Sequence, residues 1–274
     1  MLDTHTKDTC PFCGDAGKAV GVCHHEEVFC CRRCQGLFFK RAVLDARFRQ
    51  HKPWYVDYRD RTKETADTLL AMMRPAYEKQ LDVLETLVPG KRILDFGCGL
   101  GVFLEVARQR GWDVLGVDVS SDAAKFAERN FHVRYLSSLD TLSDSSMDVV
   151  RVSHVLEHCV DIEALLVQFA RVLSPRGILM ITVPHGESFC SLITNRVRRI
   201  FSSKPKYSCC LHPDGHIWGF TAQALSSLAR TCGFIPTRIF TVSMGNRTYY
   251  PFFYDGLLYR RPWASLTPGL IVRQ

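Results

Sequence analysis

The sequence of 274 residues lacks the features of several protein classes. No apolar run approaches the roughly 18 residues that a membrane-spanning helix needs, and the apolar stretch at residues 178–183 lies between a glycine and a proline. Residues 1–9 are polar and contain no apolar core of a secretory signal, and no internal repeat is present. With 46% hydrophobic and 23% charged residues, the composition excludes disordered, collagen-like and coiled-coil chains. We therefore expect a soluble, cytoplasmic, globular protein.

Cysteine and positive charge, by contrast, are abundant and unevenly distributed. Six of the 12 cysteines fall within the first 34 residues, and without a secretory signal such clustering favours metal binding over disulfides. The formal net charge of +7 is also local, because residues 32–63 hold ten Lys or Arg and three Asp, and the rest of the chain is neutral overall. A basic segment beside clustered cysteines suits a phosphate-bearing partner.

Hydrophobic periodicity divides the chain into three regions. Residues 1–40 are rich in cysteine and too few to form a core without a metal. Residues 41–90 predict a helical linker or lid, with helices at Thr62–Met73 and Ala76–Leu87 separated by Pro75. Residues 91–274 alternate short apolar runs with amphipathic stretches, which indicates βαβ units. The predicted elements there are strands at 92–95, 113–118, 133–136, 147–152, 178–183, 234–242 and 248–259, helices at 101–110, 121–130, 162–173 and 221–231, and a loop or short helix over the basic residues 196–206.

A glycine-rich loop and an acidic strand end indicate a nucleotide-like ligand. Residues 93–101 read ILDFGCGLG, in which a predicted strand runs into three alternate glycines that let the backbone turn tightly and approach a ligand closely. The next strand ends at Asp118, whose carboxylate can accept both hydroxyls of a ribose. Asp95, two residues before the first glycine, would repel a pyrophosphate but attract an ammonium group. This charge favours S-adenosylmethionine (SAM) over NAD.

Several ordered motifs resemble those of class I SAM-dependent methyltransferases of the small-molecule branch. Beyond the glycine loop, these are SMDVV at 146–150, HVLEH at 154–158, FARVLSPRG at 169–177, HIWGFT at 216–221 and CGF at 232–234. The resemblance covers residues 91–240. It implies an α/β, Rossmann-like, seven-stranded and mostly parallel sheet, with an N-terminal zinc ribbon and a helical linker, and it implies SAM as the cofactor.

The resemblance also implies roles for residues of the glycine loop and the strand ends. Asp95, Gly97 and Gly99 would contact the methionine end of SAM, together with Cys98 between the glycines. Asp118 would hold the ribose, and Val119 would line the adenine slot. The family often has an acidic residue after the third strand, and here Ser138 or Leu139 stands at that place, so a backbone contact is expected. Ser153, after the fourth strand, completes the predicted cofactor site.

The N-terminal cysteines form the pattern C-x2-C-x17-C-x2-C. Each pair can direct two thiolates at one ion, and four thiolates suit tetrahedral Zn²⁺. We predict a structural zinc bound by Cys10, Cys13, Cys31 and Cys34. Cys23, His24 and His25 are interpreted as bystanders at the tip of the ribbon. A second site built from Cys209, Cys210, His212 and His216 matches no standard spacing.

Candidate acceptor-side residues lie at the predicted carboxyl ends of the strands, where α/β sheets bind ligands. His185 and His216 are the favoured general bases, and His154 is a further candidate. His154, Glu157 and His158 have the spacing of one helix face. Glu157 and His158 either brace this segment or, as in the resembling ubiquinone-pathway O-methyltransferases, contribute to a divalent metal site.

Three functions fit the sequence. The first is a methyltransferase acting on a small-molecule hydroxyl or amine, such as a sugar, nucleotide-sugar, lipid-linked or natural-product acceptor, with the basic residues 196–206 binding an acceptor phosphate. The second is an RNA methyltransferase, because aromatic residues are interleaved with the charges of residues 32–63. The third is a SAM-binding module without catalysis, which the intact cofactor motifs disfavour. We favour the first; the sequence does not define the oligomeric state.

Overall fold

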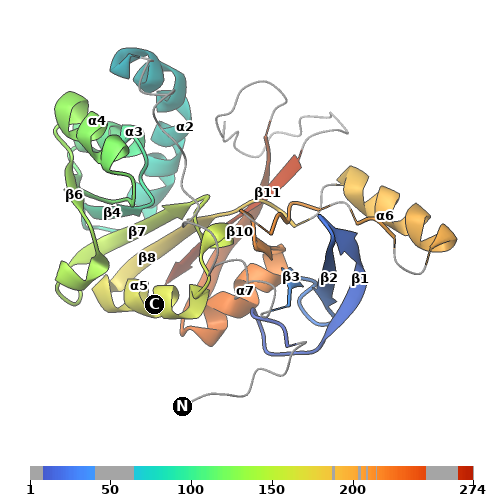
Figure 1. Ribbon diagram of the computed structural model, residues 1–274. Coiled ribbons are helices and arrows are strands. Elements are labelled where there is room, and N and C mark those ends of the chain that lie inside the picture. Colours follow the sequence, from blue (N-terminus) through green and yellow to red (C-terminus); the bar gives the residue numbers. More distant parts are fainter. Residues whose placement is uncertain are drawn as a thin grey trace.

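The computed structural model describes residues 9–40, 65–186, 189–202, 205–207, 209–213, 215–244 and 265–273. The chain builds a twisted α/β body with a small antiparallel sheet beside it (Figure 1). None of the described helices is long and apolar enough to cross a membrane.

The main sheet has the strand order β10-β11-β8-β7-β4-β5-β6. Five neighbouring strands, from β8 to β6, run parallel, whereas β11 is antiparallel to both β8 and β10. This arrangement confirms the predicted α/β, Rossmann-like class. The strands are β4 (Arg92–Phe96), β5 (Asp113–Val117), β6 (Arg134–Leu136), β7 (Met147–Ser153), β8 (Leu173–Thr182), β10 (Ile235–Met244) and β11 (Ser265–Arg273).

Helices cover both faces of this sheet because its central strands are apolar on both sides. On one face, α2 (Ala66–Leu87), α3 (Val102–Gln109) and α4 (Ser121–Phe131) bury a cluster that includes Leu81 and Phe103. On the other face, α5 (Ile162–Val172) and α7 (Ala222–Thr231) bury a second cluster around Phe169 and Leu228. Helix α6 (Phe189–Phe201) projects from the body beside the small sheet (Figure 1).

The predicted helix break at Pro75 is wrong, because α2 continues through this residue. Proline removes one backbone donor and crowds the preceding turn, which usually ends or kinks a helix. Here Leu69 lies before the proline and Leu81 and Leu84 lie after it, and all three are buried in the same cluster. The burial of both halves against one face offsets the lost hydrogen bond. Thr65 caps the helix by accepting from the Thr68 amide at 3.2 Å.

The start of one predicted strand also differs from the structure. Strand β8 begins at Leu173, five residues before the predicted start, because its first residues already pair with β7 at Met147. The predicted strand Thr248–Tyr259 lies outside the described residues, and the strand that pairs beside β8 is β11. The basic stretch at 196–206 is helical up to Phe201.

The small sheet, which we call the ribbon, joins the N-terminal segment to the body. Its strands β1 (Gly17–Cys23), β2 (Glu26–Cys31) and β3 (Leu37–Phe39) are antiparallel, and β3 pairs with the two-residue strand β9 (Trp218–Gly219). Phe12 packs against Trp218 and Phe220, with ring centroids 6.1 and 5.1 Å away. The ribbon therefore shares its core with the α/β body.

The Asp148 carboxylate fastens the start of β4 to β7. It accepts hydrogen bonds from the Arg92 backbone amide and guanidinium at 2.7–3.0 Å, and these bonds hold the pKa of Asp148 below its ordinary value. A carboxyl group with a lowered pKa in the folded state stabilises the protein above its unfolded pKa, and this contribution is lost as the pH falls.

We predict that Asp148→Asn lowers the free energy of unfolding by about 1–2 kcal/mol at neutral pH, because charge-assisted hydrogen bonds are lost. The difference from wild type should shrink as the pH falls below about 4, because the carboxyl of the unfolded chain is protonated there and that of the folded protein at still lower pH. Urea unfolding at both pH values measures this. Asp144→Asn is the control, since its side chain is 77% exposed and pairs with Arg171 at the surface. An equal loss in both variants at neutral pH would contradict the prediction.

Candidate functional site

The glycine loop joins β4 to α3 at the carboxyl edge of the sheet. Gly97, Gly99 and Gly101 all have positive φ values of 74°, 52° and 75°, a backbone conformation that favours glycine. A Cβ atom on Gly97 would lie 2.2 Å from the Val155 Cγ2 atom. This close approach requires glycine and places the loop directly against the segment that follows β7.

Asp118 lies beside this loop at the end of β5. One of its carboxylate oxygens accepts from the Gly99 amide at 2.8 Å, and the other accepts from the Ser120 amide at 2.9 Å. The two bonds fix the orientation of the carboxylate between the glycine loop and the start of α4. Each oxygen retains further acceptor capacity. The arrangement suits a ligand that presents two neighbouring hydroxyl groups.

The structure places Asp95 inside the body rather than at its surface. Its side chain is 1% exposed, and Oδ1 accepts from the Arg151 guanidinium at 2.7 Å. Burial raises the pKa of Asp95, and the Arg151 charge opposes this rise. Arg151 also donates to the Gln80 side chain at 3.0 Å and lies 4.1 Å from the Phe103 ring centroid. Among the residues that the structure describes, Arg151 is therefore the cationic partner of this carboxylate.

The other predicted cofactor residues lie around the same strand ends. The Cys98 thiol is buried and donates to the Val117 carbonyl, and burial raises its pKa. Val119 is 80% exposed, which leaves its side chain accessible to a ligand. Ser138 accepts from the Asp140 amide and donates to its carboxylate, so its hydroxyl is already engaged. Ser153 pairs with Thr182 at the end of β7.

A buried carboxylate surrounded by imidazoles follows β7. Glu157, in the short helix η3 (Leu156–His158), is fully buried, and its Oε1 lies 3.5 Å from the His154 Nδ1 atom and 3.9 Å from the His158 Nε2 atom. Among the described residues, neither Glu157 oxygen has a hydrogen-bond partner, and neither has the buried His154 Nε2 atom. Burial alone would raise the pKa of Glu157, but His154 and His158 lower it below its ordinary value.

Backbone geometry directs His154 toward this carboxylate. Its φ is +55°, an uncommon value for a residue other than glycine, and its amide donates to the Thr182 carbonyl at 2.8 Å. Such conformations concentrate at functional sites, where the surrounding structure maintains them. Val155, the next residue, is the one that contacts Gly97. Residues 154 and 155 thus connect the two parts of the site, because Val155 adjoins the glycine loop and His154 adjoins Glu157.

His216 lies near the same cluster, and His185 lies on a neighbouring segment. The rings of His216 and His158 have centroids 4.8 Å apart, and their Nδ1 atoms face the carbonyls of Cys210 and Gly215. Burial lowers the pKa of His158 and favours its neutral form. One ligand atom each from Glu157, His158 and His216 lies within 4.8 Å of the others, a spacing that could hold a metal ion. His185 forms an isolated bridge with Phe220.

The four predicted metal-ligating cysteines come together between the two knuckles of the ribbon. Their sulfur atoms all lie within 4.8 Å of one another, with Cys10 and Cys34 3.5 Å apart and Cys13 and Cys31 3.4 Å apart. Backbone amides donate to the sulfurs of Cys10 and Cys31 at 3.4 Å. The set of four converging thiols fits a tetrahedral soft-metal centre. Cys209, Cys210 and His212 do not join a metal-ligand group among the described residues.

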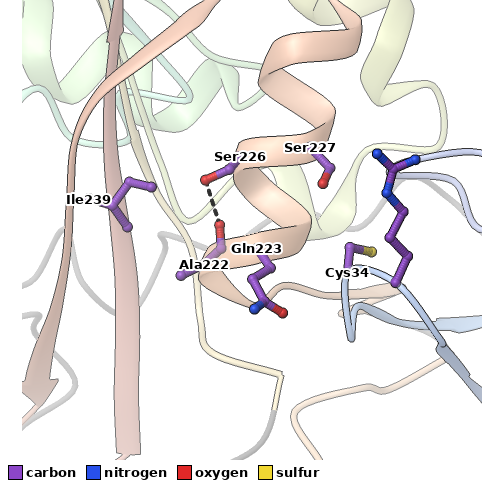
Figure 2. A pocket seen from close by; sticks show the side chains of 7 residues that line it. Cys34, Ala222, Gln223, Ser226, Ser227 and Ile239 are labelled. Atoms are coloured by element: carbon purple, nitrogen blue, oxygen red, sulfur yellow. Dashed lines mark hydrogen bonds between the residues drawn. The ribbon is translucent and has the colours of Figure 1, made fainter.

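A shallow hollow lies beside the ribbon, away from the glycine loop. Figure 2 shows it between the Cys34 knuckle, the first turns of α7 and Ile239 of β10. Its lining is made mostly of small and polar side chains, and the Ser226 hydroxyl already donates to the Ala222 carbonyl. Because none of the predicted cofactor or catalytic residues lines it, the hollow is separate from the candidate site.

Sequence reasoning missed one feature of this arrangement and had a signal for another. Arg151 was not recognised as the partner of Asp95, although a lone charge within the apolar strand Val149–Val152 was a usable signal. The spacing of His154, Glu157 and His158, which predicts that they share one face, agrees with the position of both imidazoles beside the Glu157 carboxylate.

The fold is that of an α/β protein, and the glycine loop and fixed Asp118 carboxylate at this edge of its sheet suit a nucleotide-like ligand. A family model described as a methyltransferase domain matches residues 69–237. Because this match covers more than half of the chain, the protein belongs to the methyltransferase domain family.

Curated relatives share only part of their length with this chain. The ubiquinone biosynthesis O-methyltransferase of Idiomarina loihiensis is 36% identical over 97 residues, which are 32% of this chain and 40% of the relative. The malonyl-[acyl-carrier protein] O-methyltransferase of Serratia marcescens is 30% identical over 118 residues, 42% of this chain and 46% of the relative. The chain thus matches less than half of the length of these relatives.

Solved structures share the fold at low identity. A SAM-dependent methyltransferase from Archaeoglobus fulgidus has a TM-score of 0.50 and 20% identity, covering 79% of this chain and 98% of that one. The 1,6-didemethyltoxoflavin-N1-methyltransferase of Burkholderia thailandensis, solved with S-adenosylhomocysteine, has a TM-score of 0.52 and 20% identity, covering 85% and 88%.

Proposed function

We propose that this protein is a SAM-dependent methyltransferase acting on a hydroxyl or amine of a small molecule. The observation that carries the proposal is the Asp118 carboxylate fixed against a loop of left-handed glycines at the carboxyl edge of the sheet. In α/β proteins this edge is where ligands bind. SAM, when bound, supplies an electrophilic methyl group on its sulfonium.

The residues of the chain have distinct roles in this proposal. Asp118 binds the ribose hydroxyls, Val119 contacts the adenine, and Gly97, Cys98 and Gly99 let the backbone approach the methionine end. Ser138 and Ser153 border the two ends of the cofactor. Asp95 adds negative charge beneath the loop, although Arg151 partly neutralises it. Alignment and exclusion of water are the main contributions of the protein to such a displacement.

The geometry favours His154 over His185 and His216 as the general base. Its Nδ1 atom faces Glu157, and its Nε2 atom remains without a partner among the described residues. Nε2 could therefore accept the acceptor's proton while Nδ1–H points at the carboxylate. The negative charge of Glu157 stabilises the imidazolium that forms. In this proposal, His185 and His216 lie on the side of the site where the acceptor binds.

A small acceptor is favoured over RNA. The curated relatives are named for O-methylation in ubiquinone biosynthesis and of a malonyl-acyl-carrier protein, and these names support an organic acceptor. The basic segment proposed to bind RNA lies mostly outside the described residues. Of its aromatic residues, Phe38 and Phe39 are 2% and 1% exposed in the ribbon core, so they are not available for base stacking.

Methyl transfer from labelled SAM tests the proposal directly. We expect label to enter a small-molecule extract but not total RNA. Asp118→Asn should weaken SAM binding about 10- to 100-fold in calorimetry, because an acceptor of the ribose hydrogen bonds loses its charge. Asp122→Asn, an exposed carboxylate in the first turn of α4, is the control. Unchanged affinity in Asp118→Asn, or salt-sensitive labelling of RNA alone, would overturn the assignment.

We also propose that Cys10, Cys13, Cys31 and Cys34 hold one structural Zn²⁺. The metal would hold residues 1–40 together as a ribbon. In this division of the chain, a helical linker at 41–90 and the methyltransferase domain at 91–274 follow the ribbon. The Thr221 hydroxyl, which caps α7, donates to the Cys34 carbonyl at 2.7 Å. The metal centre would therefore support a helix of the body as well as the ribbon.

Elemental analysis of protein purified without chelators should find about one zinc per chain. Cys31→Ser should lose this metal and lower the melting temperature, because removal of a ligand leaves the ribbon without its staple. Cys232→Ser, a cysteine outside the ribbon, should retain it. Protein that contains no zinc would exclude the site, and a second equivalent retained in Cys31→Ser would indicate that Glu157, His158 and His216 bind metal.

The role of Glu157 as a positioning residue predicts a change in pH dependence. Glu157→Gln should lower kcat about 10- to 100-fold, since the protonated base loses its neighbouring negative charge. For the same reason, the acidic limb of the pH–rate profile should move to lower pH. Glu163→Gln, on the exposed side of α5, provides the control. A loss of activity with an unmoved acidic limb would indicate a structural role only.

A further inference from the structure

Helix α6 has an apolar face that points away from the protein. Five of its large apolar side chains are exposed: Leu192, Ile193, Val197, Ile200 and Phe201, with exposed fractions between 40% and 83%. In the described part of the chain, most large exposed apolar residues lie on this helix. Isolated exposed apolar residues are ordinary, but a contiguous group of them marks an interaction site.

The spacing of these residues makes the face continuous. Ile193, Val197, Ile200 and Phe201 are separated by four, three and one residues, which places them within about 100° of one another around a helix. Asn195, on the opposite side, is 3% exposed. A polar residue thus faces the body while the apolar residues face solvent, which is the reverse of an ordinary surface helix.

Two arginines fasten the helix in this orientation. The Arg198 guanidinium donates to the Lys206 carbonyl at 3.0 Å, and Arg199 lies 5.6 Å from the ring centroid of Tyr207. The segment that receives them is itself paired with the ribbon, because the Tyr207 amide donates to the carbonyl of Val22 in β1 at 2.7 Å. The outward direction of the apolar face is therefore set by contacts on the other side of the helix.

The residues from 188 to 213, which include helix α6, carry charge of one sign. Residues 188–213 contain five Lys or Arg and no Asp or Glu. Arg196, at the edge of the apolar face, is exposed, as is Lys206. An apolar face bordered by basic side chains is complementary to a bilayer surface that contains anionic lipids, into which such helices insert lying flat. With 13 residues, or about 20 Å, the helix is too short to span the hydrocarbon core.

We propose that α6 binds the surface of anionic lipid bilayers, with Ile193, Val197, Ile200 and Phe201 inserted among the acyl chains. A second copy of this chain is a poorer occupant, because a symmetric contact would bring two acid-free, basic helices together. The inference does not depend on the methyl-transfer reaction. It adds that the acceptor would bind next to a membrane, because the candidate residue His185 precedes the start of α6 by only four residues.

The test is co-sedimentation of the full chain with vesicles of phosphatidylcholine alone and with about 30% phosphatidylglycerol, a fraction that gives a strongly negative surface. We expect binding to the anionic vesicles that is several-fold stronger than to the neutral ones and that weakens with added salt. Ile200→Ser/Phe201→Ser should lower the partition coefficient at least about tenfold, because the apolar contribution is lost.

Two matched variants separate this face from general stickiness. Val167→Ser/Ile235→Ser removes apolar side chains that are 57% and 62% exposed elsewhere, and it should bind like wild type. Arg196→Gln should lower binding to anionic vesicles about fivefold, whereas Arg230→Gln on α7 should not. Circular dichroism checks that each variant is folded, which is expected for substitutions at the surface.

Two outcomes would overturn the proposal. One is absence of binding to anionic vesicles by the wild type, or equal binding by Ile200→Ser/Phe201→Ser. The other is self-association in sedimentation velocity that this double substitution abolishes while vesicle binding is unaffected, since the face would then be occupied by a second copy. Activity is not needed for any of these measurements, so failure here would leave the methyltransferase proposal standing.

Discussion

The buried ion pair between Asp95 and Arg151 is the contact on which the centre of the molecule depends. Both side chains are almost inaccessible to water, at 1% and 6% exposure, so each charge requires the other. Arg151 also engages Gln80 of α2 and the ring of Phe103 in α3. One guanidinium therefore joins two strands and two helices just beneath the glycine loop. The layer below the loop thus supports its backbone, and the loop glycines permit its left-handed conformation.

The ribbon is a second constraint, and it acts on the other side of the sheet. Strand β9 has only two residues, yet it pairs with β3 and lies in the segment that follows His216. The Ile217 amide donates to the Glu157 carbonyl at 2.8 Å, and the Trp218 indole donates to the Cys159 carbonyl at 2.6 Å. The four cysteines of the ribbon, strand β9 and the cluster of Glu157 with His154 and His158 thus form one packed unit. A metal bound by the N-terminal cysteines would therefore help to position residues of the acceptor side that lie far away in the sequence.

Local patterns in the sequence were sufficient for the class of fold and for the location of the glycine loop. Alternate glycines after an apolar strand and paired cysteines separated by two residues encode geometry within a few residues of themselves. Helix and strand periodicity is equally local, which explains why most elements between residues 92 and 231 were predicted. Pro75 was misjudged because the burial that carries α2 through it comes from α3, a different part of the chain.

The sequence by itself therefore determined the family-like motifs, the spacing of the four ribbon cysteines and the alternation of strands and helices. The tertiary structure alone decided which distant groups meet. Arg151 donates to Gln80, which is 71 residues away in the sequence, and the Cys34 carbonyl accepts from Thr221, which is 187 residues away. It also decided the direction of α6, whose apolar periodicity reads the same whether that face is buried or exposed. Periodicity specifies that a helix has an apolar side, but only the burial of Asn195 and the contacts of Arg198 and Arg199 with the body turn that side toward solvent.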